Sequence, residues 1–250
     1  MKTLILTDNA LALEWAKELA ALHGEIDVCQ SPKGSLRDVP RVDVRSQVPQ
    51  ISQNYRLVVS IHCKQVFPAE LVRRVRCVNV HPGFSPFNRG WFPHVFSIMN
   101  GMKAGATIHE MDEQLDHGPI IAQTEYEIKP WDTSGTAYAN IMRIEKELLF
   151  GHFPSIRAQT YRAQSPGEEG NINYARDFES LRRIDLNQRG AFRDLLNRLR
   201  ALTHDELNNA YFIDESGRRI YVRVILVPEH PGDGPATPAE ADKRRLDRSP

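Results

Sequence analysis

Short apolar runs alternate with amphipathic stretches along the first 130 residues. The apolar runs predict strands at Thr3–Thr7, Ile26–Cys29, Leu57–Ile61, Cys77–Val80, Ala106–Met111 and Ile120–Ile128. Between the early runs, helices are predicted at Ala10–Leu22, which Asp8-Asn9 can cap, at Pro49–Asn54 and at Pro68–Val75. Strand–helix–strand repeats usually place consecutive strands parallel, with helices on both faces of the sheet. The pattern therefore predicts an α/β fold.

The pattern changes after residue 130. We predict a long helix at Thr133–Phe153 with Ser134 as its cap, a surface loop at Tyr161–Asn173, a helix at Arg189–Leu202, and a hairpin of Tyr211–Ile213 and Arg219–Val227 around the turn Asp214–Arg218. The expected fold is a Rossmann-like parallel or mixed sheet with flanking helices, plus a small C-terminal helix and β-hairpin. Residues 1–155 should form the main domain, 156–229 the extension, and 230–250 a disordered tail rich in Pro, Gly and charge.

Composition narrows the functional classes. The formal net charge is zero, which disfavours a general affinity for nucleic acid or for an acidic membrane surface. No apolar stretch approaches the roughly 20 residues that a membrane helix requires. The three cysteines, Cys29, Cys63 and Cys77, have no metal-ligand spacing and no disulfide pattern. We therefore expect a cytoplasmic protein that binds neither nucleic acid, membrane nor metal.

Polar residues follow three of the predicted strands. Asp8-Asn9, His62-Cys63-Lys64 and His81 each come directly after a strand, and ligands of open α/β sheets bind beyond the carboxyl ends of the strands. The first turn lacks the G-x-G-x-x-G pattern, which disfavours a nicotinamide dinucleotide. Taken alone, His62 is interpreted mainly as a structural residue.

The stretch from Cys77 to Gly83 carries the clearest chemistry. Alternate side chains of a strand share a face, so Asn79 and His81 point the same way at the strand's end. About thirty residues later, Asp116 precedes the turn residue Gly118 and can orient a histidine. An amide donor, an imidazole base and a carboxylate suit acyl transfer to an amine, which needs no Ser or Cys nucleophile.

These motifs resemble a known family. Asn79-Val80-His81, the Pro86–Gly90 loop and Asp112-x-x-x-Asp116-x-Gly118 resemble the signature of the 10-formyltetrahydrofolate-dependent formyltransferases. Ser60–Gln65 and Asn88–Pro93 resemble its sugar N-formyltransferase branch, which formylates dTDP-linked 4-amino-4,6-dideoxyhexoses, notably dTDP-4-amino-4,6-dideoxyglucose. The likeness covers nearly all of the chain except the residues after about position 229.

The resemblance implies roles for individual residues. The catalytic set would be Asn79, His81 and Asp116. N10-formyltetrahydrofolate, as co-substrate, would lie against the backbone of Gly105, Ala106, Thr107, Ile108 and His109 and against the loop of Asp112. The contacts to the nucleotide sugar would come from Asn9, Lys64, Asn88, Arg89, Gly90 and Trp91. The C-terminal hairpin would build a homodimer, and the product would serve lipopolysaccharide or other glycan biosynthesis.

Other functions fit the same residues. A formyl-folate hydrolase or a glycinamide ribonucleotide formyltransferase would share the Asn-His-Asp set but use water or another amine. A folate- or nucleotide-binding protein without catalysis is a further alternative. A tRNA substrate is disfavoured because only about a hundred residues, without a basic surface, follow the core. Which aminosugar is used, and whether its amine is at C-3 or C-4, stays open.

Overall fold

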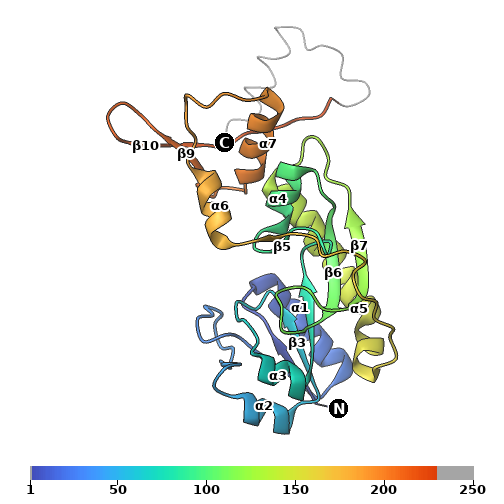
Figure 1. Cartoon of the computed structure of the whole chain (residues 1–250). Helices are drawn as coiled ribbons and strands as arrows, with labels where there is room; N and C mark the ends of the chain where they lie inside the picture. The colour runs from blue at the N-terminus through green and yellow to red at the C-terminus, as the bar shows by residue number, and fades with distance from the viewer. Residues whose placement is uncertain (1, 230–250) are drawn as a thin grey trace.

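A six-stranded mixed sheet forms the centre of the computed structural model, which describes residues 2–229 (Figure 1). The strand order is β2-β1-β3-β4-β6-β7. Its strands are β1 Thr3–Leu6, β2 Ile26–Cys29, β3 Leu57–Ile61, β4 Arg76–His81, β6 Ala104–Glu110 and β7 Ile120–Tyr126. The first four are mutually parallel, whereas β6 runs antiparallel to both β4 and β7. The predicted α/β class with a parallel or mixed sheet is confirmed.

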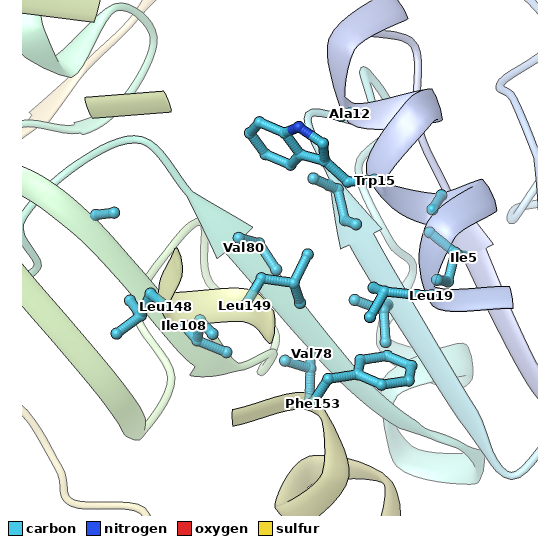
Figure 2. Packing of buried hydrophobic residues seen from close by; sticks show 14 of the residues in the cluster. Ile5, Ala12, Trp15, Leu19, Val78, Val80, Ile108, Leu148, Leu149 and Phe153 are labelled. Atoms are coloured by element: carbon cyan, nitrogen blue, oxygen red, sulfur yellow. The ribbon is translucent and has the colours of Figure 1, made fainter. Parts of the chain in front are cut away.

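Helices cover both faces of this sheet. On one face, α1 (Ala10–His23) and α5 (Ser134–Ala158) pack Trp15, Leu19, Leu149 and Phe153 against strand residues such as Val78 (Figure 2). On the other face lie α2 (Val48–Asn54) and α3 (Ala69–Arg74). Burying each large apolar side chain contributes roughly 1.5–3 kcal/mol, so the two layers lock the order of the strands.

The parallel strands bring their carboxyl ends to one edge. The backbone N–H of Asp8, after β1, donates to the carbonyl of His62, after β3. Ile61 of β3 pairs with Val80 of β4, so the residues that follow them, His62 and His81, also lie at this edge. The polar residues that follow these strands therefore lie at one edge of the sheet.

Two helices were missed by the sequence analysis. The helix α4 (Pro93–Asn100) buries most of its surface, so it lacks the alternation of apolar and polar faces that predicts a helix. Its signals were Pro93 at the first turn and Gly101 at the end, with a φ of +72°. The helix α6 (Ala175–Arg182) buries only Phe178 and is closed at its start by Asp177, whose carboxylate accepts the Tyr174 N–H.

The boundaries of α5 differ from the prediction in two respects. Thr133, not Ser134, caps the helix, because its hydroxyl accepts the N–H of Thr136. The helix also continues through Pro154 to Ala158 instead of ending at Phe153. Proline removes one hydrogen-bond donor, but the buried residues Phe153 and Ile156 hold the last turns against the sheet. Residue 155, the predicted domain boundary, therefore lies inside a helix.

The remaining elements gather at the end of the molecule opposite α2 and α3 (Figure 1). They are α6, α7 (Phe192–Leu202), and the hairpin of β9 (Ala210–Ile213) and β10 (Arg219–Val222). The predicted hairpin is confirmed, although its second strand ends at Val222 and not at Val227. The predicted loop Tyr161–Asn173 ends in β8 (Ile172–Asn173), which pairs with β5 (Arg89–Gly90). No helix among residues 2–229 is long and apolar enough to span a membrane; the predicted tail 230–250 lies outside the described residues.

Candidate active site

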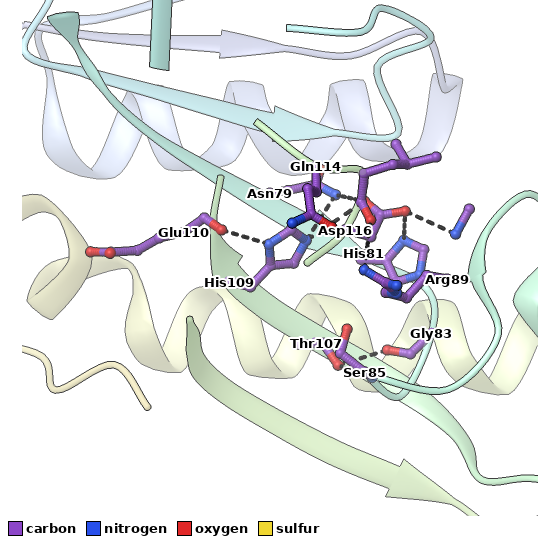
Figure 3. Close-up of polar contacts among 12 residues, drawn as sticks. Asn79, His81, Gly83, Ser85, Arg89, Thr107, His109, Glu110, Gln114 and Asp116 are labelled. Carbon is purple, nitrogen blue, oxygen red and sulfur yellow. Dashed lines mark hydrogen bonds and ion pairs between the residues drawn. The ribbon is translucent and has the colours of Figure 1, made fainter. Parts of the chain in front are cut away.

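Asn79 and Asp116 meet beside the end of β4. Asn79 Nδ2 lies 3.0 Å from Asp116 Oδ1 and 3.3 Å from His109 Nε2, on the neighbouring strand β6 (Figure 3). His109 Nδ1 lies 2.7 Å from the carbonyl oxygen of Glu110, which only accepts, so the hydrogen of a neutral His109 is on Nδ1. Both N–H groups of Asn79 are thus donated, one to a carboxylate and one to an imidazole.

Asp116 is held as a buried carboxylate. Although burial favours its neutral form, the positive charge available at His81, the neighbouring imidazole of His109 and the hydrogen bond from the Gly90 N–H lower its pKa below the usual range. Its Oδ2 accepts the Gly90 N–H at 3.0 Å and lies 3.5 Å from His81 Nδ1. The φ of Asp116 is +47°, a left-handed conformation that turns this side chain out of the loop toward β4.

His81 presents one unused nitrogen. Its side chain is only 5% exposed, and its Nε2 has no hydrogen-bond partner among residues 2–229. Burial lowers the pKa of His81, and the negative charge of Asp116 opposes that shift. Because Nδ1 faces the carboxylate, the proton of the neutral ring belongs on Nδ1, and Nε2 carries the free lone pair. This nitrogen is available to accept a proton from a reacting group.

The backbone of Gly83 packs closely against the His81 ring. A Cβ added to Gly83 would lie 2.5 Å from His81 Nε2, so only glycine lets the chain approach this nitrogen so closely. Thr107 of β6 holds the same loop: its hydroxyl donates to the Gly83 carbonyl at 2.7 Å and accepts the Ser85 N–H at 3.0 Å (Figure 3). The position of the loop beside Nε2 is therefore fixed by hydrogen bonds to β6.

Three residues predicted to contact substrate instead hold the loop after β4. Asn88 is fully buried, and its side chain bonds to Ser97, Asn100, Asn171 and Asn173. The buried guanidinium of Arg89 donates to the Leu115 carbonyl and to Glu169. Gly90 has a φ of +90° and donates its N–H to Asp116. The polar groups of the Asn88 side chain all bond to the protein, and its predicted contact with the substrate stays a prediction.

Trp91, Asn9 and Lys64 have surfaces that a ligand can reach. Trp91 is 45% exposed and lines a shallow pocket of about 460 Å³ together with Tyr174, Ala175 and Arg176. Asn9 is half-buried and caps α1, accepting the N–H groups of Leu11 and Ala12. Lys64 is exposed, and its backbone N–H donates to Asp8 Oδ2 at 2.7 Å.

The predicted folate contacts on β6 differ in accessibility. Thr107, Ile108 and His109 pair with β4 on one side and β7 on the other, so the sheet already uses their backbone groups. Gly105 and Ala106 pair with β7 beyond the last residue of β4 in the ladder. β6 is an interior strand over most of its length, which its sequence alone does not reveal. Asp112, 36% exposed, accepts the Gln114 N–H and lies 2.7 Å from His117 Nδ1.

A second polar cluster was not recognised from the sequence. His62 Nε2 lies 2.7 Å from Glu145 Oε2 of α5, and Tyr138 of the same helix lies beside both His62 and Asn9. His62 had been interpreted mainly as structural, and Glu145 had not been considered. The missed signal was the spacing of Glu145, four residues after Ile141 and four before Leu149, on the face that α5 buries.

The arrangement around His81 suits acid–base catalysis on an acyl group. It supplies a free basic nitrogen, a carboxylate behind the opposite ring nitrogen, and amide hydrogens from Asn79, in a site from which water is largely excluded. Within residues 2–229, no three His, Cys, Asp or Glu side chains are arranged to hold a metal ion.

Comparisons with known proteins agree with this chemistry. Residues 37–152 match the family model described as formyl transferase, and residues 177–228 match the N-formyltransferase dimerization C-terminal domain. The dTDP-4-amino-4,6-dideoxyglucose formyltransferase of Mycobacterium tuberculosis is 60% identical over 233 residues, which cover 93% of this chain and all of that protein.

Solved structures give the same likeness. A sugar N-formyltransferase from Shewanella sp. superposes with a TM-score of 0.88 at 37% identity, covering 92% of this chain and 99% of that one. A 4-N formyltransferase from Francisella tularensis superposes with a TM-score of 0.86 at 36% identity, covering 91% and 98%. The likeness thus includes the C-terminal elements as well as the sheet.

Proposed function

Because this chain belongs to the formyl transferase family, we propose that it transfers the formyl group of N10-formyltetrahydrofolate to the amine of a dTDP-linked 4-amino-4,6-dideoxyhexose. The expected acceptor is dTDP-4-amino-4,6-dideoxyglucose, since the Mycobacterium tuberculosis relative that carries this name is 60% identical along its entire length. The observation that carries the proposal is the unpartnered Nε2 of His81, with Asp116 behind the other ring nitrogen.

His81 acts as the base during transfer. After the sugar amine has attacked the formyl carbon, Nε2 accepts a proton from the sugar nitrogen and passes it to N10 of the departing folate. Asp116 keeps the Nδ1 hydrogen in place and stabilises the imidazolium that forms. The hydrogen bond from Gly90 and the low pKa of Asp116 ensure that the carboxylate is charged in this role.

Asn79 stabilises the negative oxygen that develops on the formyl group. One of its N–H groups stays with Asp116 at 3.0 Å, and the other, in the longer 3.3 Å contact with His109, is the one that can turn to the oxyanion. His109 then positions Asn79 before the ligands bind.

The nucleotide sugar and the folate occupy different sides of this centre. We assign Asn9, Lys64 and the exposed ring of Trp91 to the nucleotide sugar, with the Lys64 ammonium facing the diphosphate. Arg89 and Gly90 support Asp116 and its loop. For the folate we keep the backbone of Gly105 and Ala106 and the half-exposed Asp112.

The C-terminal elements are proposed to form a homodimer. Residues 177–228 match a dimerization domain, and β10 and the segment after it expose large apolar side chains, including Tyr221 at 43% and Ile225 at 90%. We place the enzyme in the cytoplasm, in keeping with its three free thiols, and its product in glycan biosynthesis.

Mass spectrometry of a reaction containing N10-formyltetrahydrofolate and dTDP-4-amino-4,6-dideoxyglucose tests the function. We expect the sugar nucleotide to gain one formyl group in proportion to the tetrahydrofolate formed. The 3-amino isomer, in a parallel reaction, tests the position of the amine. Tetrahydrofolate release without a formylated sugar would support the formyl-folate hydrolase instead. Tight ligand binding without any product would support a binding protein.

A further inference from the structure

The edge of the sheet holds a second imidazole–carboxylate pair that the reaction scheme above does not use. Glu145 is completely buried on α5, and its Oε2 lies 2.7 Å from Nε2 of His62, whose side chain is 12% exposed. The other oxygen of Glu145, Oε1, has no hydrogen-bond partner among residues 2–229. Burying a carboxylate is strongly unfavourable unless a partner stabilises its charge, and here the partner is an imidazole near the active site.

Hydrogen-bond directions identify the basic nitrogen of His62. Asn9 Oδ1 accepts the N–H groups of Leu11 and Ala12, so Asn9 Nδ2 faces the Tyr138 hydroxyl and donates to its oxygen at 3.3 Å. The hydroxyl hydrogen of Tyr138 is then free to point at His62 Nδ1, 3.5 Å away. His62 therefore carries its hydrogen on Nε2, facing Glu145, and a lone pair on Nδ1.

This second base lies at the end of the strand next to that of the first. Ile61 of β3 pairs with Val80 of β4, so His62 and His81 follow at the same level on adjacent strands. A φ of +54° turns the His62 side chain toward α5, while His81 lies with Asn79 and Asp116. Burial lowers the pKa of His81, and after Asp116 and His109 the charges acting on that pKa are those of Glu145 and His62. Two imidazoles thus share one edge, each with its own carboxylate.

The chemistry of formyl transfer calls for two proton acceptors. An aliphatic amine with a pKa of about 8–10 is mainly an ammonium ion at pH 7, and an ammonium nitrogen has no lone pair with which to attack. Its nitrogen must lose one proton before attack and a second before the formamide is complete. His81 can return only the second of these to N10, so the first must pass either to solvent before the amine binds or to a separate group in the site.

We propose that His62, oriented by Glu145, is that group, and that it deprotonates the bound sugar ammonium before attack; this rests on the proposed function. His62 Nδ1 takes the first proton once the Tyr138 hydroxyl, in its long 3.5 Å contact, turns away. The sugar nitrogen then forms a bond to the formyl carbon. His81 takes the second proton and gives it to N10 as the bond between the formyl carbon and N10 breaks. His62 afterwards releases its proton to solvent, so one proton is liberated per formamide formed. Glu145 is a positioning residue, because it acts through His62.

The test is the pH dependence of kcat/KM for the sugar nucleotide in Glu145→Gln and His62→Asn. Without the dyad only free amine can react, and free amine decreases tenfold for each pH unit below the amine's pKa. We expect a loss of about 10- to 100-fold at pH 7 that disappears above the pKa of the sugar amine, measured on the substrate alone by NMR titration. A variant that is partly unfolded loses kcat/KM by the same factor at every pH at which its stability is the same. The slope of the loss of kcat/KM against pH therefore separates a chemical role from a structural one.

Several titratable groups around His62 contribute to the pH dependence of kcat/KM. They come from several elements and comprise Glu145 and Tyr138 of α5, His81 of β4, His94 of α4, His204 after α7, and Asp8 after β1. His94→Gln is the matched control, because His94 is a buried imidazole of the same cluster that bonds to Ser134 and to no carboxylate. It should keep the wild-type profile.

Two results would overturn the inference. One is a loss of kcat/KM that is equal at every pH in both variants, and the other is no loss of kcat/KM in either variant. Absence of formyl transfer by the wild-type enzyme at every pH would instead contradict the proposed function, and the inference with it. Wild-type activity with unaltered pH profiles in the variants would leave the function standing and refute only the role of His62.

Discussion

The carboxamide of Asn79 donates a hydrogen bond of 3.0 Å to the carboxylate of Asp116, although 37 positions of sequence separate the two residues. Asn79 lies two residues before the end of the central strand β4, and Asp116 projects from the loop between two antiparallel strands, β6 and β7. This bond, with that from Gly90, fixes the carboxylate behind His81. The geometry of the proposed site therefore depends on how two distant loops close over one strand end.

Replacing His81 or Asn79 should remove catalysis and keep the fold. His81→Ala loses the proton acceptor, which typically accounts for about 10²–10⁴ in rate, and Asn79→Ala loses a donor to the oxyanion, at about 10²–10³ in kcat. Stopped assays with both substrates at saturation measure kcat, and circular dichroism checks the fold. Near-normal turnover in both purified variants would contradict the assignment.

Gly83→Ala should inactivate the enzyme through a single methyl group. The added Cβ would lie 2.5 Å from His81 Nε2, which shields the basic nitrogen or displaces the ring, and we expect kcat to fall at least about 10²-fold. Gly151→Ala is the matched control, since nothing lies within 4 Å of its added Cβ in the middle of α5. That variant should keep its kcat and gain about 0.5–1 kcal/mol in the free energy of unfolding.

Asp116→Asn should alter both activity and the response of stability to acid. The pKa of Asp116 is lower in the folded protein than the ordinary value of 3.8, so the unfolded chain binds the proton more readily. The charged Asp116 carboxylate therefore adds to the free energy of unfolding above about pH 4, and this contribution is lost as pH falls below that value. Denaturant titrations between pH 7 and pH 3 should therefore show a smaller loss of unfolding free energy in the variant than in the wild type.

The same substitution should reduce kcat by about 10²–10⁴, because the imidazolium of His81 loses its counter-charge. An equal acid dependence in both proteins, together with wild-type turnover, would show that Asp116 is neither charged nor coupled to His81.

Trp91→Ala should weaken binding of the nucleotide sugar selectively. The ring is 45% exposed beside Tyr174 and Arg176, and losing an aromatic contact with the ligand should raise KM for the sugar nucleotide about tenfold, or roughly 1.4 kcal/mol. KM for the folate should stay within about twofold of the wild-type value. Trp131→Ala, with a ring 44% exposed outside the site, is the control. A change in KM for the folate alone would place Trp91 on the other substrate.

Tyr221→Glu should convert the proposed dimer into monomers. Tyr221 is 43% exposed on β10, within the range matched to a dimerization domain, and a buried unpaired carboxylate disfavours association. Light scattering after gel filtration should show the mass fall by half. Leu22→Lys, at a 65% exposed position on α1, should leave the mass unchanged. A dimer that tolerates the charge at Tyr221 would locate the interface elsewhere.

Local sequence patterns were sufficient to predict the general architecture and the residue types of the proposed catalytic set. The runs at Leu57–Ile61 and Cys77–Val80 are mostly apolar because β3 and β4 are largely buried on both faces, so sequence alone identified them. Asn79 and His81 were recognisable because the two-residue period of a strand places both on one side. In contrast, α4 was invisible to the same reasoning, because a helix buried nearly all round has no polar face to reveal its period.

The roles of individual side chains were decided in three dimensions. Asn88 was expected to bind substrate, and in the structure its side chain bonds to Ser97, Asn100 and Asn171. No sequence pattern pointed to Glu145, which pairs with His62 across 83 positions of sequence. The sequence by itself determined which stretches form strands, which strand ends carry an amide, an imidazole and a carboxylate, and which family the chain resembles. Only the tertiary structure decided which of those groups keep a free lone pair, because hydrogen-bonding capacity is used up by partners that come from distant parts of the chain.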